Sequence, residues 1–191
     1  MSFRRINWPG LFCGLSLMSL LLLSIAYKVP WWQLNIADGL GHVSVSPLDV
    51  DINLMGASID VPLIWYLNVG SKLALLLVAA AFLFYSVNMD TQHSRRLLDV
   101  IYKKPVYMVA SLVIIGIVNR FIVGAFLPFS LPIVGTSTVA LSSNSVTLSI
   151  PVTASFTWVF WLALAGALLS ILTRLYHNRF NEFSSAQIDL K

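Results

Sequence analysis

Residues 68–87 read NVGSKLALLLVAAAFLFYSV, and this stretch decides the fold class. After Lys72 come fifteen uncharged residues, most of them apolar, and a helix needs about 20 such residues to cross the hydrocarbon core of a membrane. The whole chain has a matching composition, since 58% of its 191 residues are hydrophobic and only 10% are charged. A soluble domain carries roughly a quarter charged residues. The sequence therefore predicts a membrane protein.

Four stretches are long and apolar enough to span a membrane, so we predict an all-α transmembrane four-helix bundle in a single membrane domain, residues 1–191. The predicted spans are residues 9–28, 62–88, 106–127 and 153–174. All eight prolines lie outside the interiors of these spans. Pro62 and Pro105 stand at predicted helix starts, where the missing N–H costs little. The proline positions and the hydropathy thus indicate the same four helices.

The charged residues predict the orientation of the spans, because cytoplasmic loops carry an excess of Lys and Arg. Residues 89–105 hold four basic residues against two acidic ones, whereas residues 128–152 hold no charge. We therefore expect a multi-pass plasma membrane protein with both termini in the cytoplasm. The cytoplasmic loop is residues 89–105, the cytoplasmic tail is residues 175–191, and the outer loops are residues 29–61 and 128–152. Trp31 and Trp32 fall near a predicted membrane boundary, where aromatic residues are common.

The first predicted span has a second interpretation. Arg4 and Arg5, the apolar run and the small residues of Ser24-Ile25-Ala26 also fit a secretory signal peptide with its cleavage site. We favour an uncleaved first helix, because the run is long enough to span the membrane.

Both outer loops alternate apolar and polar residues with the period of a β-strand. The first contains HVSVSPLDVDINL (42–54), with a phase break at Pro47 and a turn signal at Gly56. The second contains TSTVALSSNSVTLSI (136–150), which repeats the pattern around a Ser-Ser-Asn-Ser turn. We therefore predict a small extracytoplasmic antiparallel β-sheet built from the two outer loops, with two strands from the first and a hairpin from the second. Uncharged strand edges favour contact with other chains.

This plan resembles that of claudins, which also have four helices, cytoplasmic termini and strands in both outer loops. The stretch VPWW (29–32), just after the first predicted span, is similar to a Pro-x-Trp motif of that group. The Gly-Leu-Trp with two following cysteines that marks claudins is absent, since this loop has Gly39-Leu40-Gly41 and no cysteine. The resemblance covers the topology and one short motif.

Two basic residues lie at matching depths inside predicted spans. Lys72 and Arg120 are sixteen and fifteen residues from the cytoplasmic ends of their spans. At a rise of about 1.5 Å per residue, both lie about 23 Å from the inner boundary, in the outer leaflet of a core about 30 Å thick. Gly116 and Gly124 share a helix face with Arg120, and small residues mark close contacts between membrane helices. We therefore predict that Arg120 points into the bundle.

Three roles for these cations are open. Both side chains can extend to the outer headgroups. An aspartate of the first outer loop, Asp60 or Asp51, can act as their counter-ion. The third role is a binding site for an anion, which would be a lipid phosphate, a quinone oxygen or a small solute. The candidate ligand-binding residues are Lys72, Arg120, Asn68 and Asn119.

The predicted spans lack the residues of most catalytic sites. No Asp or Glu lies inside a span, and the three histidines lie in the predicted loops and tail, so we expect no proton relay and no haem. The single cysteine, Cys13, excludes an intrachain disulfide and a cysteine metal cluster. His42 is the only histidine that could assist an outer serine. We expect no metal, no cofactor, no nucleic acid and no enzymatic activity of the chain on its own.

We therefore predict a non-catalytic integral membrane protein that acts as a structural or accessory subunit through its outer β-sheet and helix faces. Its partners would be membrane lipids and either other proteins or further copies of itself. The alternative is a small-molecule site for an anion, a lipid or a quinone between the second and third spans. A protein with such a site would be an accessory subunit of a membrane oxidoreductase or a carrier.

Overall fold

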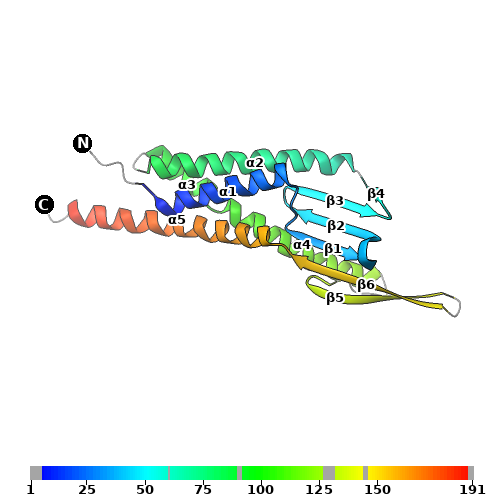
Figure 1. Cartoon of the computed structure of the whole chain (residues 1–191). Coiled ribbons are helices and arrows are strands. Elements are labelled where there is room, and N and C mark those ends of the chain that lie inside the picture. Colours follow the sequence, from blue (N-terminus) through cyan, green and yellow to red (C-terminus); the bar gives the residue numbers. More distant parts are fainter. Residues whose placement is uncertain (1–5, 60, 90–91, 127–131, 144–145, 189–191) are drawn as a thin grey trace. The chain divides into compact units, whose positions relative to one another are not determined.

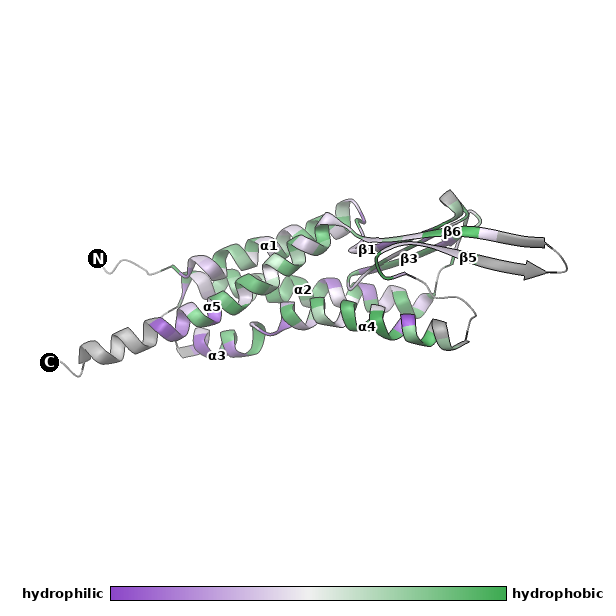
Figure 2. Ribbon diagram, turned by 90° about the horizontal axis from the view of Figure 1, so that it is seen from below, coloured by the Kyte–Doolittle hydropathy of each residue, from purple (hydrophilic) through white to green (hydrophobic). Residues whose placement is uncertain are grey.

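The computed structural model describes residues 6–59, 61–89, 92–126, 132–143 and 146–188. Its long helices are α1 (Trp8–Ala26), α2 (Pro62–Val87), α4 (Lys104–Phe126) and α5 (Trp158–Ile188) (Figure 1). Four helices in the described part of the chain are long and apolar enough to cross a membrane. Figure 2 shows apolar residues along most of their length. A shorter helix, α3 (Gln92–Ile101), occupies most of the predicted cytoplasmic loop.

The sheet contains six strands in the order β4-β3-β2-β1-β6-β5, and all neighbouring pairs are antiparallel. The strands are β1 (Trp32–Ile36), β2 (Gly41–Ser46), β3 (Asp49–Leu54), β4 (Ala57–Ser58), β5 (Gly135–Ser143) and β6 (Val146–Phe156). The first four lie between α1 and α2 in the chain, and the last two lie between α4 and α5 (Figure 1). The predicted combination of long apolar helices with an antiparallel sheet is confirmed.

The fourth helix differs most from its predicted span of 153–174. Strand β6 continues to Phe156, so α5 begins only at Trp158, and it then extends to Ile188. Pro151 suggested the start of a helix, but it lies within β6, opposite Thr138 of β5. Helix α5 continues beyond Arg174, where hydropathy falls, because helix formation does not require apolar residues.

Strand β1 is a second difference, since the sequence predicts no strand at residues 32–36. In the structure Trp31 is only 1% exposed, and its N–H donates to the carbonyl oxygen of Val45 at 3.1 Å. The indole Nε1 of Trp32 donates to the carbonyl oxygen of Ile133 at 2.7 Å. Both tryptophans therefore belong to the packing of the sheet and its adjoining segments.

The two faces of the sheet differ in polarity. One face carries a hydrophobic cluster formed by Leu34, Val139, Val152 and Ala154, with Trp32, Ile36, Val43 and Ile150 packed against it. The register places polar residues on the other face, because side chains alternate along each strand. One row runs across all six strands, through Thr136, Thr153, Asn35, His42, Asn53 and Ser58. A second row runs through Ser155, Gln33, Ser44 and Asp51.

The chain divides into two compact units. The helical unit comprises Met1–Leu23, Lys72–Val109 and Trp161–Lys191, and the sheet unit comprises Ser24–Ser71 and Ala110–Phe160. The division falls within the four long helices, so each of them contributes residues to both units.

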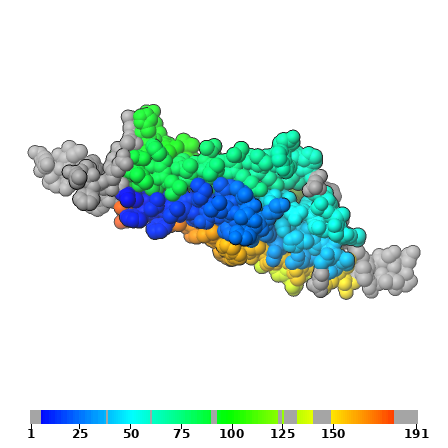
Figure 3. Space-filling model, turned by 45° about the horizontal axis from the view of Figure 1, so that its top comes forward, coloured from blue at the N-terminus to red at the C-terminus, as the bar shows by residue number. Residues whose placement is uncertain are grey.

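In the helical unit, small residues bring the helices into close contact. A Cβ atom added at Gly14 of α1 would lie 2.8 Å from the side chain of Leu83 of α2, and one at Gly166 of α5 would lie 3.1 Å from Ser16 Oγ of α1. The thiol of Cys13 donates to the carbonyl oxygen of Gly166 at 3.4 Å. Helix α1, blue in Figure 3, therefore packs against both α2 and α5. Small residues of this kind allow membrane helices to approach closely.

The helical unit also contains a buried polar chain. Asn7 caps α1, since its Oδ1 accepts the N–H of Gly10 at 3.0 Å. Its Nδ2 donates to Tyr85 Oη at 3.2 Å, and Tyr85 Oη lies 2.9 Å from Nδ1 of His177. Asn7 and Tyr85 are 0% exposed and His177 is 3% exposed. Residues far apart in the sequence thus meet in one chain of hydrogen bonds.

Candidate functional site

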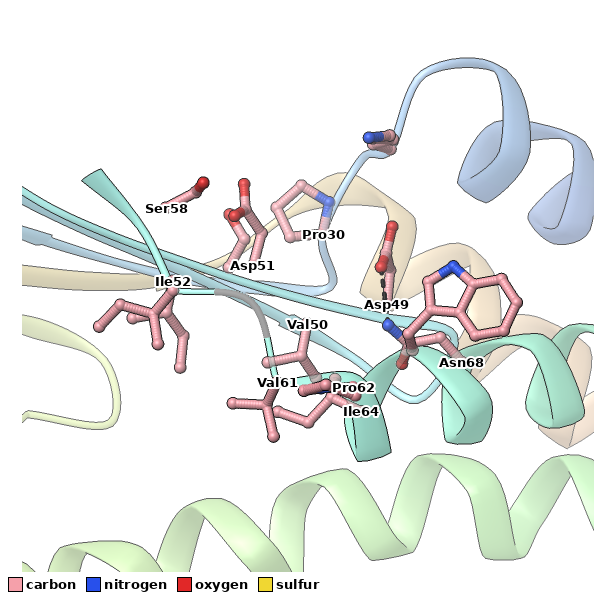
Figure 4. Close-up of a pocket in the computed structure, with 14 residues that line it drawn as sticks. Pro30, Asp49, Val50, Asp51, Ile52, Ser58, Val61, Pro62, Ile64 and Asn68 are labelled. Atoms are coloured by element: carbon pink, nitrogen blue, oxygen red, sulfur yellow. Dashed lines mark hydrogen bonds between the residues drawn. The ribbon is translucent and has the colours of Figure 1, made fainter. Parts of the chain in front are cut away.

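A cavity of about 590 Å³ lies in the sheet unit, beside β3 and the first turns of α2. The side chains around it are shown in Figure 4. Its polar lining residues are Lys28, Ser44, Asp49, Asp51, Ser58 and Asn68, and its apolar wall includes Val50, Ile52, Val61, Ile64 and Trp65. Cavities of this size accommodate small organic ligands. The combination of an apolar wall with polar groups suits an amphipathic molecule.

A turn and one hydrogen bond fix the cavity wall where β3 begins. The Oγ of Ser46 accepts the backbone N–H groups of Leu48 and Asp49, at 3.2 and 2.8 Å, which closes the turn between β2 and β3. The Nδ2 of Asn68 donates to Oδ1 of Asp49 at 2.9 Å (Figure 4). This bond connects the second turn of α2 to the start of β3.

Three polar side chains of β1 and β2 form a hydrogen-bonded relay. Oδ1 of Asn35 lies 2.6 Å from Nδ1 of His42, and Oγ of Ser44 lies 2.7 Å from Nε2 of the same ring. A carbonyl oxygen only accepts, so in the neutral imidazole His42 Nδ1 carries the proton and Nε2 is the acceptor. The Ser44 hydroxyl therefore donates to Nε2. We call these residues the Asn35–His42–Ser44 relay.

The strand geometry explains why these side chains meet. His42 and Ser44 are two residues apart on β2, so they share a face. Asn35 lies directly opposite His42, because the turn at Ala37–Gly39 sets the register of β1 and β2. Gly39 has a φ of 121°, a conformation that favours glycine. Ser44 alone of the three lines the cavity, so the relay ends in the cavity at a hydroxyl group.

The relay is absent from the sequence-based predictions. They name His42 as the only histidine available to an outer serine, without pairing it with Ser44. The i, i+2 spacing of His42 and Ser44 within a predicted strand is the signal that could have found the pair. Asn35 could not be identified as a partner of His42, because the sequence does not predict strand β1.

The charges around the cavity favour neutral or cationic ligands. Among the lining residues, Asp49 and Asp51 are acidic and Lys28 is basic. Among the described lining residues, two carboxylates against one ammonium group give a negative balance, which disfavours a free anion by simple electrostatics. The cavity therefore differs in ligand preference from the anion site that the sequence analysis considered.

The predicted ligand-binding residues are distributed over several places. Asn68 lines the large cavity, together with Asp51, one of the two predicted counter-ions. Asn119 and Arg120 line a second cavity of about 90 Å³. Lys72 belongs to the helical unit. The other predicted counter-ion, Asp60, lies outside the described residues. A common site of Lys72, Arg120, Asn68 and Asn119 stays a prediction.

The surroundings of Arg120 differ from those that the glycine stripe indicated. Arg120 and Asn119 are exposed on α4. A Cβ atom added at Gly116 would meet no heavy atom within 4 Å, so no close helix contact occurs there in the described part of the chain. The second cavity, also lined by Trp32 and Ile133, adjoins Gly116 instead. The glycine at this position is therefore not explained by helix packing.

Among the described residues, no group of three His, Cys, Asp or Glu side chains could hold a metal ion. No known protein family, characterised protein or solved structure matches the chain.

Proposed function

We propose that the protein is a multi-pass integral membrane protein that acts as a structural or accessory subunit, with its β-sheet outside the cytoplasm as the contact surface. The four long apolar helices support membrane insertion. The excess of basic residues in 89–105 and their absence from 128–152 support cytoplasmic termini and an outer sheet.

Strand β5 is the observation that carries this proposal. It stands at the end of the strand order and runs over nine residues, Gly135–Ser143, so one of its edges has no neighbouring strand among the described residues. Its sequence, GTSTVALSS, contains no charge and no proline. Charged residues and proline are the usual means by which soluble proteins protect a sheet edge. An unprotected edge of this length favours the addition of a strand from another chain.

The opposite edge of the sheet is different. Strand β4 has only two residues, Ala57–Ser58, and pairs with Asn53 and Leu54 alone. Such a short edge strand offers few backbone groups to a partner. The proposed partner is therefore an extended strand that pairs with β5, from another subunit or from a second copy of this chain.

Charge substitutions on β5 test the proposal. Thr136 and Thr138 are exposed, and a lysine at either position adds a charge to the edge strand. Thr153 is an exposed residue on β6 that lies opposite Thr136, so Thr153→Lys is the matched control away from the edge. We expect Thr136→Lys and Thr138→Lys to release the partner in native mass spectrometry after mild extraction, while Thr153→Lys retains it. A monomer without a partner in the wild type would contradict the proposal.

Cysteine labelling tests the orientation. Cys13 is buried, and its replacement by alanine leaves a chain without cysteine. In that background we expect Thr138→Cys to react with a membrane-impermeant maleimide on intact cells. A cysteine in place of Ser185 is expected to react only after the cells are opened. The reverse pattern would overturn the orientation but not membrane insertion.

A further inference from the structure

We propose that Ser44 is a nucleophilic serine that accepts an acyl group from a neutral or cationic ester bound in the 590 Å³ cavity. His42 acts as its general base, and Asn35 positions the imidazole. The proposal is independent of strand addition at β5.

The relay has the geometry that such chemistry requires. An activated serine needs a base within about 2.6–3.2 Å and a third group that orients the base. The 2.7 Å distance from Ser44 Oγ to His42 Nε2 and the 2.6 Å distance from His42 Nδ1 to Asn35 Oδ1 meet both requirements. The tautomer set by Asn35 leaves the lone pair of Nε2 directed to the hydroxyl.

The reaction follows from these positions. Ser44 Oγ attacks the carbonyl carbon of the ester while its proton passes to His42 Nε2. The tetrahedral intermediate collapses, the C–O bond to the alcohol breaks, and the leaving oxygen takes the proton from Nε2. A water molecule then attacks the acyl-serine, again giving a proton to Nε2, and the carboxylic acid departs as Ser44 regains its proton. One ester and one water give one alcohol and one acid.

The lining of the cavity defines the substrate class. Asp51 lies opposite Ser44 in the register of β2 and β3, and Asp49 lines the same cavity, so anionic esters are repelled. Among the described residues of the lining, Lys28 is the one basic residue and the candidate partner for the developing oxyanion. Val50 and Ile52 pair with Val45 and Val43, so they lie on the opposite face of β3 from Asp51 and do not form a wall beside Ser44. The substrate is therefore a small uncharged or cationic ester.

A structural role for the same contacts makes a different prediction. Polar residues on the solvent face of a sheet commonly pair with each other, as Gln33 Nε2 does with Ser155 Oγ at 3.3 Å. A serine in such a pair has no enhanced reactivity. Covalent labelling separates the two roles, because it reports nucleophilicity and not stability.

The test uses the full-length protein in mild detergent and an uncharged alkyl fluorophosphonate. We expect a mass adduct on a single serine, Ser44, and a slow hydrolysis of p-nitrophenyl butyrate. His42→Gln is expected to lower the labelling rate about 10²-fold or more, since it removes the general base. Asn35→Leu is expected to lower it less, and Ser155→Ala, on the same face but outside the relay, is expected to leave it unchanged.

Three results would overturn the proposal. One is the absence of an adduct on Ser44 while the thermal unfolding of the protein is normal. Another is an adduct whose rate is the same in His42→Gln and in the wild type. The third is unchanged ester hydrolysis by a Ser44→Ala variant whose thermal unfolding is normal, because the hydrolysis then does not depend on Ser44.

Discussion

Tyr85 and His177 are 92 residues apart in the chain, yet Tyr85 Oη and His177 Nδ1 lie 2.9 Å apart in the core of the helical unit. The two rings meet edge to face, with centroids 5.8 Å apart. Since Asn7 Nδ2 donates to Tyr85 Oη, the hydroxyl accepts one hydrogen bond and is available to donate the other to the histidine. One buried hydroxyl thus connects α2, α5 and the start of α1.

The hydroxyl of Tyr85 should therefore contribute measurably to stability. Tyr85→Phe removes it without changing the volume of the core and leaves polar groups of Asn7 and His177 buried without this partner. We expect the free energy of unfolding in detergent to fall by about 1–3 kcal/mol. Tyr107→Phe is the matched control, because Tyr107 is 60% exposed, and we expect no change there. Equal free energies of unfolding for Tyr85→Phe and Tyr107→Phe would show that the buried hydrogen bonds of Tyr85 contribute little to stability.

The glycines of α1 and α4 should respond differently to substitution. A Cβ atom at Gly14 would approach both the side chain and the backbone nitrogen of Leu83, at 2.8 and 3.2 Å, so helix α1 or α2 must shift. We expect Gly14→Ala to lower the free energy of unfolding by about 1–3 kcal/mol. Gly116→Ala meets no atom within 4 Å, and alanine is the better helix former by about 1 kcal/mol. We expect the melting temperature to be highest for Gly116→Ala, intermediate for the wild type and lowest for Gly14→Ala.

The sequence predicts the limits of three of the four long helices well, because their signals are local. Hydropathy and proline positions depend only on the residues of one helix and its ends. For this reason α1, α2 and α4 begin and end within two residues of their predicted limits. Strand β6 was partly assigned to a helix, because its last residues, VTASF, directly precede the apolar run of α5. Only pairing with β1 and β5 distinguishes those residues as a strand.

The candidate site was harder to predict because its contacts cross between strands. The alternation of residues 42–54 predicts that His42 and Ser44 lie on the same face of a strand. The position of Asn35 opposite His42 depends instead on the register of β1 and β2, which the turn at Ala37–Gly39 sets. The bond between Asn68 and Asp49 likewise joins residues from a helix and a strand. Sequence analysis singled out Asn68 by its position near Lys72, and it did not predict Asp49 as its partner.

Trp31 should be the most sensitive aromatic residue of the sheet unit. It is 1% exposed, its N–H bonds to Val45, and its carbonyl oxygen accepts the N–H of Thr157 at 3.0 Å. We expect Trp31→Ala to lower the free energy of unfolding by about 3–5 kcal/mol, since it leaves a large cavity. Trp158→Ala is the control, because Trp158 is 60% exposed. A role of Trp31 only as a membrane-boundary residue would instead make the two variants equal.

The contact between Asn68 and Asp49 should make the stability of one variant depend on pH. Asn68→Asp replaces the amide donor with a second carboxylate where Nδ2 now lies 2.9 Å from Asp49 Oδ1. At pH 7 the two negative charges repel, so we expect a loss of about 1 kcal/mol or more relative to the wild type. In acid the introduced carboxyl group binds a proton and becomes a donor to Asp49, so the loss should shrink as the pH falls. Asn119→Asp, an exposed site on α4, should show no such dependence when unfolding is followed from pH 7 to pH 4. A constant difference between Asn68→Asp and the wild type over this range would mean that the aspartates do not face each other.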